Sequence, residues 1–419
     1  MTLKTSTHFA SAWAEGTDWR DTAKTVLEKL ETIRTEGDGF SLGFLYITDD
    51  LADDAAGILN LFKSVTGIDN WLGCSGIGVC ANGECFLNKT AIVVMIAKIP
   101  EDDFWVTQGT TLGLEQSEKN LKPWMDDNQP FCMIAHGDPM ADENPAHDLS
   151  ALAEMTESFL VGGLSSSRSA HVQFANDIVD NGVSGILLNQ SVGVVTGLSQ
   201  GCKPISEAHS ITQAHDNTIM ELDNKPAFQV FTEDVRDYAK AHIDNPQGEE
   251  RPSLGVSDIE DIIAPVKEMF QGDIHMAIPI QGSDQKDFMV RNIAGLDPEN
   301  GWISIGQPVT QGDKVMFVRR NHDSVEEDLS KTLLNLRKRF HNDYGEADPK
   351  GALYISCVAR AGQRLSTGRA DIYSDQSPTN EMELIQEIIG DIPIIGYYAS
   401  GEISNARLYG YTGILILFN

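Results

Sequence analysis

The sequence contains no apolar run long enough to cross a bilayer, and its most apolar segments, 91–97 and 413–418, have the length of single strands. Residues 1–8 are polar and lack the apolar centre of a secretory signal, so we expect a cytoplasmic protein. Low-complexity tails and coiled-coil heptads are also missing. These absences favour a globular protein without a membrane role.

Basic residues are scarce. The 419 residues include 31 Lys and Arg against 62 Asp and Glu, a formal net charge of −31. A surface this acidic repels phosphate backbones and anionic lipid, so we expect neither nucleic acid nor a membrane among the partners.

Motifs for the common catalytic and cofactor chemistries are missing as well. There is no GxGxxG or Walker spacing, no GxSxG, no HExxH and no CxxCH. We therefore predict no catalytic residue and no metal site, and a binding module ahead of an enzyme. An enzyme that uses Cys74 or Cys357 as a nucleophile stays open, since both lie at the ends of predicted strands. The six cysteines lie mostly in or beside apolar strands without CxxC pairing, which favours buried, reduced thiols: Cys74, Cys80, Cys85, Cys132, Cys202 and Cys357.

What the sequence does contain is a repeated plan. An apolar strand is followed by an amphipathic helix, a second strand that ends in small residues, and a third strand. Small residues at strand ends let a ligand approach the backbone closely. The three copies pair 40–47 with 71–76, 131–136 with 160–165 and 351–357 with 394–402, and their third strands are 90–97, 183–189 and 411–418.

This plan predicts an α/β protein with mixed sheets and packed helices. Each strand–helix–strand piece should form a parallel pair, and the third strand should return antiparallel. An αββα sandwich is one arrangement open to it. Because 419 residues exceed one ordinary core, we expect two domains related by pseudo-symmetry, 1–224 and 225–419, divided at the turn Asp223-Asn224-Lys225-Pro226. The polar segment 244–252 should be an exposed loop of the second domain.

Several spaced motifs follow one another over nearly the whole chain. In the first half they are Leu72-Gly73-Cys74-Ser75, Val161-Gly162-Gly163-Leu164-Ser165 and Gln200-Gly201-Cys202-Lys203-Pro204-Ile205. In the second half they are Val290-Arg291-Asn292-Ile293, Ser356-Cys357 with Arg360, and Ile395-Gly396 through Gly401-Glu402. In sequence and in order these motifs resemble the FIST family, whose members carry an N-terminal and a C-terminal FIST domain in tandem.

The resemblance implies a bacterial sensory protein that binds a small molecule such as an amino acid and regulates a histidine kinase, a cyclic-di-GMP enzyme such as a diguanylate cyclase, or a chemoreceptor. One branch of stand-alone members resembles haem proteins that sense nitric oxide. The family often has Gly-Arg-Gly after the cysteine of its C-terminal domain, whereas here Cys357 is followed by Val358-Ala359-Arg360, a departure in the loop.

For a zwitterionic ligand the charged candidates are Arg168 in the first half and Arg360 with Glu402 in the second. Arginine can clamp a carboxylate by two parallel hydrogen bonds, but Arg168 is as readily a solvated loop residue, and Arg360 and Glu402 are as readily an ion pair with each other. The predicted ligand-binding residues are Gly73, Cys74, Ser75, Gly163, Ser165, Arg168, Arg360, Gly396, Gly401 and Glu402.

Haem, if bound, would be non-covalent haem b held by one side chain, because no attachment motif exists. His136 at a strand end and His171 in the loop after Arg168 are the best placed of the ten histidines. A hydrogen-bonded core or surface histidine is the alternative reading of each.

Overall fold

The computed structural model describes residues 3–6, 8–34, 39–243, 274–280, 287–320, 322–361 and 381–419. The predicted loop 244–252 lies outside these residues. The chain forms two compact units, one made of Met1–Gln200 with Glu326–Asn419 and the other of Gly201–Val325. The predicted boundary at 224/225 falls inside the second unit, between β17 (Thr218–Leu222) and β18 (Lys225–Pro226), and stays a prediction.

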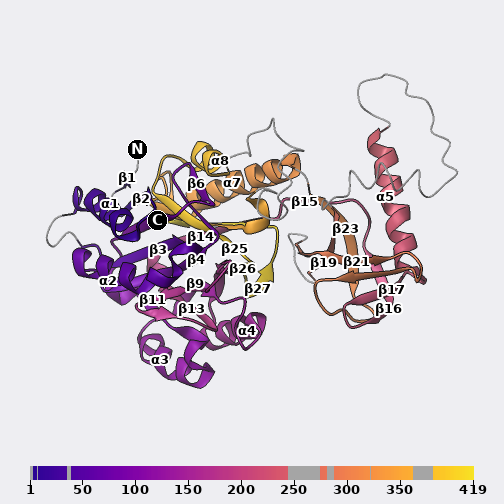
Figure 1. Cartoon of the computed structure of the whole chain (residues 1–419), viewed down its shortest axis with the longest axis horizontal. Helices are drawn as coiled ribbons and strands as arrows, with labels where there is room; N and C mark the ends of the chain where they lie inside the picture. The colour runs from indigo at the N-terminus through magenta and orange to yellow at the C-terminus, as the bar shows by residue number, and fades with distance from the viewer. Residues whose placement is uncertain are drawn as a thin grey trace. The chain divides into compact units, whose positions relative to one another are not determined.

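The first unit contains the predicted plan three times, each copy built from four main strands and a helix (Figure 1). The first copy comprises β2 (Phe9–Glu15), β3 (Leu42–Thr48), α2 (Ala55–Thr66), β4 (Asn70–Gly76) and β7 (Ala91–Ala97). The second comprises β8 (Phe104–Thr107), β9 (Pro130–Gly137), α4 (Pro145–Thr156), β10 (Phe159–Leu164) and β13 (Val183–Asn189). The third comprises β14 (Val194–Ser199), β24 (Gly351–Cys357), α8 (Glu381–Ile389), β25 (Ile394–Ala399) and β28 (Gly413–Phe418).

Strand direction agrees with the prediction in all three copies. β3 is parallel to β4, β9 to β10 and β24 to β25. The third strands β7, β13 and β28 pair antiparallel with the first strand of their own copy. The remaining strands extend the three sheets: β1 (Leu3–Thr5), β5 (Gly78–Ala81), β6 (Glu84–Leu87), β11 (Gln173–Ala175), β12 (Ile178–Val179), β26 (Glu402–Ser404) and β27 (Arg407–Tyr409).

One glycine in each copy holds the two parallel strands close together. Gly73 lies opposite Leu45, Gly162 opposite Ala135 and Gly396 opposite Tyr354. A Cβ atom at these glycines would lie 1.8, 1.9 and 1.7 Å from the carbonyl oxygen of the opposite residue, so no other amino acid fits without moving a strand.

Two details of the predicted glycine set are corrected by this register. The equivalent glycine of the second copy is Gly162, and the predicted Gly163 is one residue too far along β10. The glycines also lie within strands and not in loops. In a Gly-Gly pair both residues suit a close approach, so the sequence alone does not separate them.

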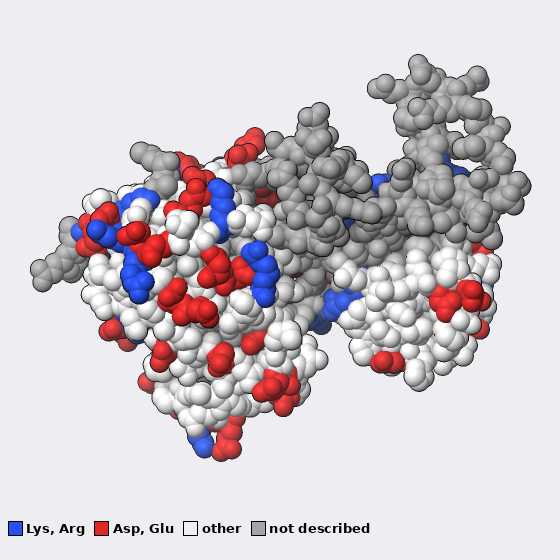
Figure 2. All heavy atoms as spheres, viewed as in Figure 1, with Lys and Arg blue, Asp and Glu red and all other residues white. Residues whose placement is uncertain are grey.

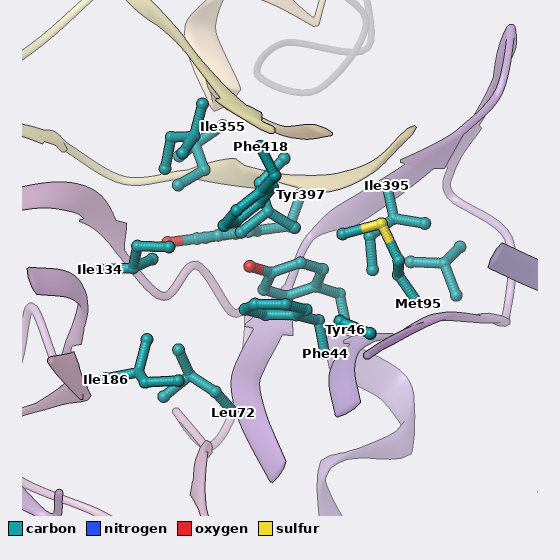
Figure 3. Packing of buried hydrophobic residues seen from close by; sticks show 14 of the residues in the cluster. Phe44, Tyr46, Leu72, Met95, Ile134, Ile186, Ile355, Ile395, Tyr397 and Phe418 are labelled. Atoms are coloured by element: carbon teal, nitrogen blue, oxygen red, sulfur yellow. The ribbon is translucent and has the colours of Figure 1, made fainter. Parts of the chain in front are cut away.

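Three sheets, not two, meet at one core. Their inner faces share a cluster that includes Phe44, Tyr46, Ile134, Tyr397 and Phe418, which pack from strands of all three sheets (Figure 3). Each fully buried side chain of this size contributes about 1.5–3 kcal/mol by leaving water. Helices cover the outer faces of the sheets, so the predicted mixed α/β class is confirmed.

The helices follow the predicted apolar faces. α1 (Trp19–Glu31) begins after Asp18, whose side chain accepts hydrogen bonds from the amides of Arg20 and Asp21. α2 ends at Gly67 with a φ of 68°, the left-handed conformation of a C-cap. α1 and α2 pack on the first sheet, α3 (Leu114–Asp127) and α4 on the second, and α7 (His322–Tyr344) and α8 on the third. Among the described residues no helix is long and apolar enough to span a membrane.

The described part of the second unit is a sheet with the helix α5 (Ala227–Ile243) packed on one face. Alternation along its strands buries Ile219 of β17 and Ile303 of β22 against this helix. The strands other than β17 and β18 are β15 (Cys202–Pro204), β16 (His209–His215), β19 (Ile274–Pro279), β20 (Phe288–Arg291), β21 (Ile293–Asp297), β22 (Trp302–Ile305) and β23 (Lys314–Arg320).

Candidate functional site

The carboxyl ends of the parallel strands in the first unit carry several of its buried polar side chains. Asp49 follows β3, Asp138 follows β9, and Arg360 follows β24, each of them buried. The carboxyl ends of parallel strands are where α/β proteins most often bind ligands. The predicted ligand residues are placed along these ends, but in separate groups.

Arg168 is held by a carboxylate that the sequence did not single out. Its Nε donates to Asp49 Oδ2 at 3.0 Å and its Nη2 to Asp49 Oδ1 at 2.9 Å, a bidentate pair, and its backbone amide also donates to Oδ2 at 2.8 Å. The Asp49 side chain is 4% exposed, whereas that of Arg168 is 55% exposed. The third guanidinium nitrogen, Nη1, makes only a 3.4 Å contact with Asn88 Oδ1 among the described hydrogen bonds. Asp49 therefore fixes one edge of a guanidinium whose other edge reaches solvent.

Arg360 is the opposite case, because it is fully buried. Its Nε and Nη2 both donate to Glu381 Oε1, at 2.8 and 2.7 Å, and its Nη1 donates to the carbonyl of Ser199 at 3.2 Å. Glu381 Oε2 accepts from the hydroxyls of Tyr354 and Ser356, both at 2.9 Å. Although burial opposes the charge of Arg360, the neighbouring Glu381 raises its pKa above the ordinary value. The group is a satisfied internal ion pair.

Glu402 does not pair with Arg360. Its Oε2 accepts from the Thr412 hydroxyl at 2.6 Å and from the Thr412 amide at 3.1 Å. The side chain is completely buried, and this burial raises the pKa of Glu402 to about 8 in spite of those hydrogen bonds. The carboxyl group is therefore mostly protonated at neutral pH. Neither member of the predicted Arg360–Glu402 pair reaches the surface.

The small predicted residues take part in contacts between loops. Ser75 Oγ accepts from the amide of Val172 at 3.1 Å, and the Ser165 hydroxyl lies 2.9 Å from His171 Nδ1. Ser75 and Ser165 are both buried. A Cβ at Gly401 would meet its nearest neighbour at 3.4 Å, an ordinary contact, so this glycine is not required by close packing.

A polar cluster lies at the centre of the three sheets. The Tyr46 hydroxyl is 3.2 Å from His136 Nε2, and the Tyr46 and Tyr397 rings stack with centroids 4.8 Å apart (Figure 3). Tyr397 donates to the carbonyl of Gly163 at 2.7 Å, and its hydroxyl also hydrogen-bonds with Cys74. Burial lowers the pKa of His136 to about 3, so its imidazole is neutral.

His136 does not fit the role of a haem ligand. Its side chain is 0% exposed, so not even a water-sized space borders the ring, and Nε2 already faces Tyr46. His171 is partly exposed, and its Nδ1 is committed to Ser165. These positions give a haem-based mechanism no support.

Cys74 and Cys357, the two predicted nucleophiles, are buried. Burial raises the pKa of the Cys74 thiol well above its usual value, and Cys357 is 6% exposed. A protonated, enclosed thiol is a poor nucleophile, which weighs against Cys74 as a catalytic residue. Within the described ranges, no three His, Cys, Asp or Glu side chains gather in a way that could hold a metal ion.

Sequence reasoning missed Asp49 and Glu381, the partners of the two arginines. Asp49 is 119 positions from Arg168, a separation that leaves no local pattern. The one available signal was position, since Asp49 lies two residues after the predicted strand 40–47 and Glu381 opens a helix.

The fold and the strand ends define an α/β protein with three copies of one sheet unit and charged groups at the carboxyl ends of its parallel strands. Comparison with known families identifies the family to which it belongs. The FIST N domain model matches residues 41–225 and the FIST C domain model matches residues 251–405. The chain therefore belongs to the FIST family, as its motifs predicted. FIST domains are sensory domains that bind small ligands in signalling proteins.

The chain is also similar to two mycobacterial proteins, both named as uncharacterized. The uncharacterized protein Mb0898c of Mycobacterium bovis is 27% identical over 417 residues, covering 95% of this chain and 96% of that protein. The uncharacterized protein MT0656 of Mycobacterium tuberculosis is 30% identical over 248 residues, covering 58% of this chain. The matched part spans 55% of that second protein.

Proposed function

We propose that this protein is a cytoplasmic sensor that binds a small zwitterion, such as an amino acid, and passes the signal to a histidine kinase, a cyclic-di-GMP enzyme such as a diguanylate cyclase, or a chemoreceptor. The tandem FIST domains support the sensory role. A ligand can switch such a partner only if it binds two states of the sensor with different affinity.

The observation that carries the proposal is the half-exposed guanidinium of Arg168. The two carboxylate oxygens of Asp49 accept hydrogen bonds from Nε and Nη2, which orients the guanidinium without covering it. A carboxylate of the ligand would accept from Nη1 at the open edge, and little side-chain entropy remains to be lost because the arginine is already fixed.

The surroundings of Arg168 suit a zwitterion better than a simple anion. Asp50, next to Asp49, is exposed and hydrogen-bonds with Thr90. Acidic side chains are also spread over the face of the first unit shown in Figure 2. These charges repel a bare anion but attract an ammonium group. A zwitterion is therefore favoured, because its carboxylate can contact Arg168 while its ammonium group is attracted by the acidic side chains.

Arg360 and Glu402 are less suited to direct ligand contact. A ligand would have to displace Glu381 from a buried, fully bonded pair before it reached Arg360. Glu402 is enclosed and mostly protonated at neutral pH, so it offers an ammonium group little charge. We assign both groups a structural role.

Thermal-shift screening of the protein amino acids and related metabolites tests the proposal. We expect at least one stabiliser whose effect is lost in Arg168→Ala and partly kept in Arg168→Lys. Arg407→Ala, at an exposed arginine of β27, is the matched control and should keep the full shift. A stabiliser unaffected by Arg168→Ala would place the site elsewhere.

A further inference from the structure

A second candidate site lies in the second unit, on the sheet face opposite α5. Strand alternation turns Ile219 and Ile303 toward the helix, so their neighbours Thr218, Trp302 and Ser304 lie on the other face. The Thr218 and Ser304 hydroxyls are 2.9 Å apart across β17 and β22, which fixes this part of the face.

The face is hollowed where β21 has a glycine. Gly295 lies opposite Ser304, and Asp297 lies opposite Trp302, so the position beside Ser304 has no side chain. A Cβ at Gly295 would find only Ser304 Cβ within 4 Å, at 3.9 Å. The resulting hollow has a volume of about 260 Å³ and is lined also by Met220.

The described lining of the hollow includes one carboxylate, Asp297, and one histidine, His215. Asp297 accepts from Asn300 Nδ2 at 2.7 Å and from the amides of Glu299 and Asn300 at 3.1 and 3.0 Å. The hydrogen bonds from Asn300 lower the pKa of Asp297 and hold its carboxylate in place. The described residues that line the hollow include no Lys or Arg.

A fixed carboxylate paired with a tryptophan across two strands is a combination that recognises organic ammonium groups. The carboxylate supplies the opposite charge, and the indole attracts a cation through its quadrupole while contacting attached methyl groups. The hollow is below the roughly 300–1,000 Å³ typical of ligand pockets, which limits the ligand to a small molecule.

We infer that this hollow binds a small organic cation, with the ammonium group between Trp302 and Asp297 and the body of the ligand in the space over Gly295. The site is independent of the proposed zwitterion contact at Arg168, since it uses none of the same residues. The two proposals can therefore fail separately.

Isothermal titration calorimetry of the full chain with choline, tetramethylammonium and dimethylbutanol, the neutral carbon isostere of choline, tests this inference. We expect the two cations to bind and the neutral isostere to bind at least about fivefold more weakly, because it lacks the cation–π and ionic contacts. Equal binding of choline and its isostere, or no binding of either cation below about 10 mM, would overturn the inference.

Filling the hollow with a larger side chain tests whether choline binds there or elsewhere on the protein. Gly295→Leu should abolish choline binding, because the new side chain occupies the ligand space without a backbone clash. Gly306→Leu is the matched control, since a Cβ there meets nothing within 4 Å. Trp302→Leu should weaken binding and Arg168→Ala should leave it unchanged. Circular dichroism and the urea midpoint of each variant confirm folding, and unchanged binding by a folded Gly295→Leu variant would refute the site.

Discussion

Replacing Arg360 by methionine separates a structural role from a ligand-binding one. The Arg360 and Glu381 side chains are 0% and 12% exposed, so the substitution leaves the Glu381 carboxylate enclosed, with the Tyr354 and Ser356 hydroxyls as its remaining partners among the described residues. Breaking a buried pair from one side costs about 3–5 kcal/mol, because an uncompensated charge stays inside. We expect Arg360→Met to lower the unfolding free energy of the ligand-free protein by roughly that amount.

Urea unfolding of four proteins measures this effect: the wild type, Arg360→Met, Glu381→Gln and the double variant. The double variant should lose less than the sum of the single losses, with a coupling of about 1 kcal/mol or more, since neither charge is then left alone. A ligand-free Arg360→Met protein within about 0.5 kcal/mol of the wild type would contradict the reasoning, because that is the range of an ordinary surface change.

Three further predictions address the glycines, a histidine and a thiol. Gly162→Ala should destabilise the protein by more than about 3 kcal/mol in urea unfolding, through a backbone clash at positive φ, while Gly401→Ala should cost under about 1 kcal/mol. Equal losses would show that the close strand approach is unimportant. His209 donates to two carboxylates at 2.7 and 2.8 Å; burial lowers its pKa, but these partners outweigh burial and raise it. The stabilisation of the wild type over His209→Asn should therefore be full below about pH 6.5 and fall as pH rises through the folded pKa; a difference that grows above neutral pH would contradict this sign. Cys74 should react slowly with iodoacetamide at neutral pH and quickly in denaturant, as site-resolved mass spectrometry can show; rapid labelling of the folded protein would revive the nucleophile hypothesis.

Local sequence patterns predicted the elements of the first unit well. Strand 351–357 is the observed β24 and strand 183–189 is the observed β13, because buried strands read as short apolar runs between turn residues. The parallel and antiparallel pairing followed from the handedness of the crossover. The repeat itself was visible because each copy must bury its own sheet face.

The long-range contacts could not be predicted in the same way. Nothing in the local pattern indicates that the chain leaves the first unit after Gln200 and returns at Glu326. The partners Asp49 and Glu381 are set by how segments distant in sequence pack together, so the charged candidates were predicted while their surroundings were not. The Gly295 hollow likewise depends on the register between β21 and β22, which a single strand does not reveal.

The central claim is that the open edge of Arg168 holds the carboxylate of a small zwitterion. Calorimetric titration of the stabiliser found by screening, into the wild type, Arg168→Ala and Arg407→Ala, tests it most directly. We predict that the alanine at 168 weakens binding roughly tenfold, about 1.4 kcal/mol for one charge-assisted contact, and that the alanine at 407 leaves the affinity unchanged. Equal affinities for all three proteins would contradict the claim.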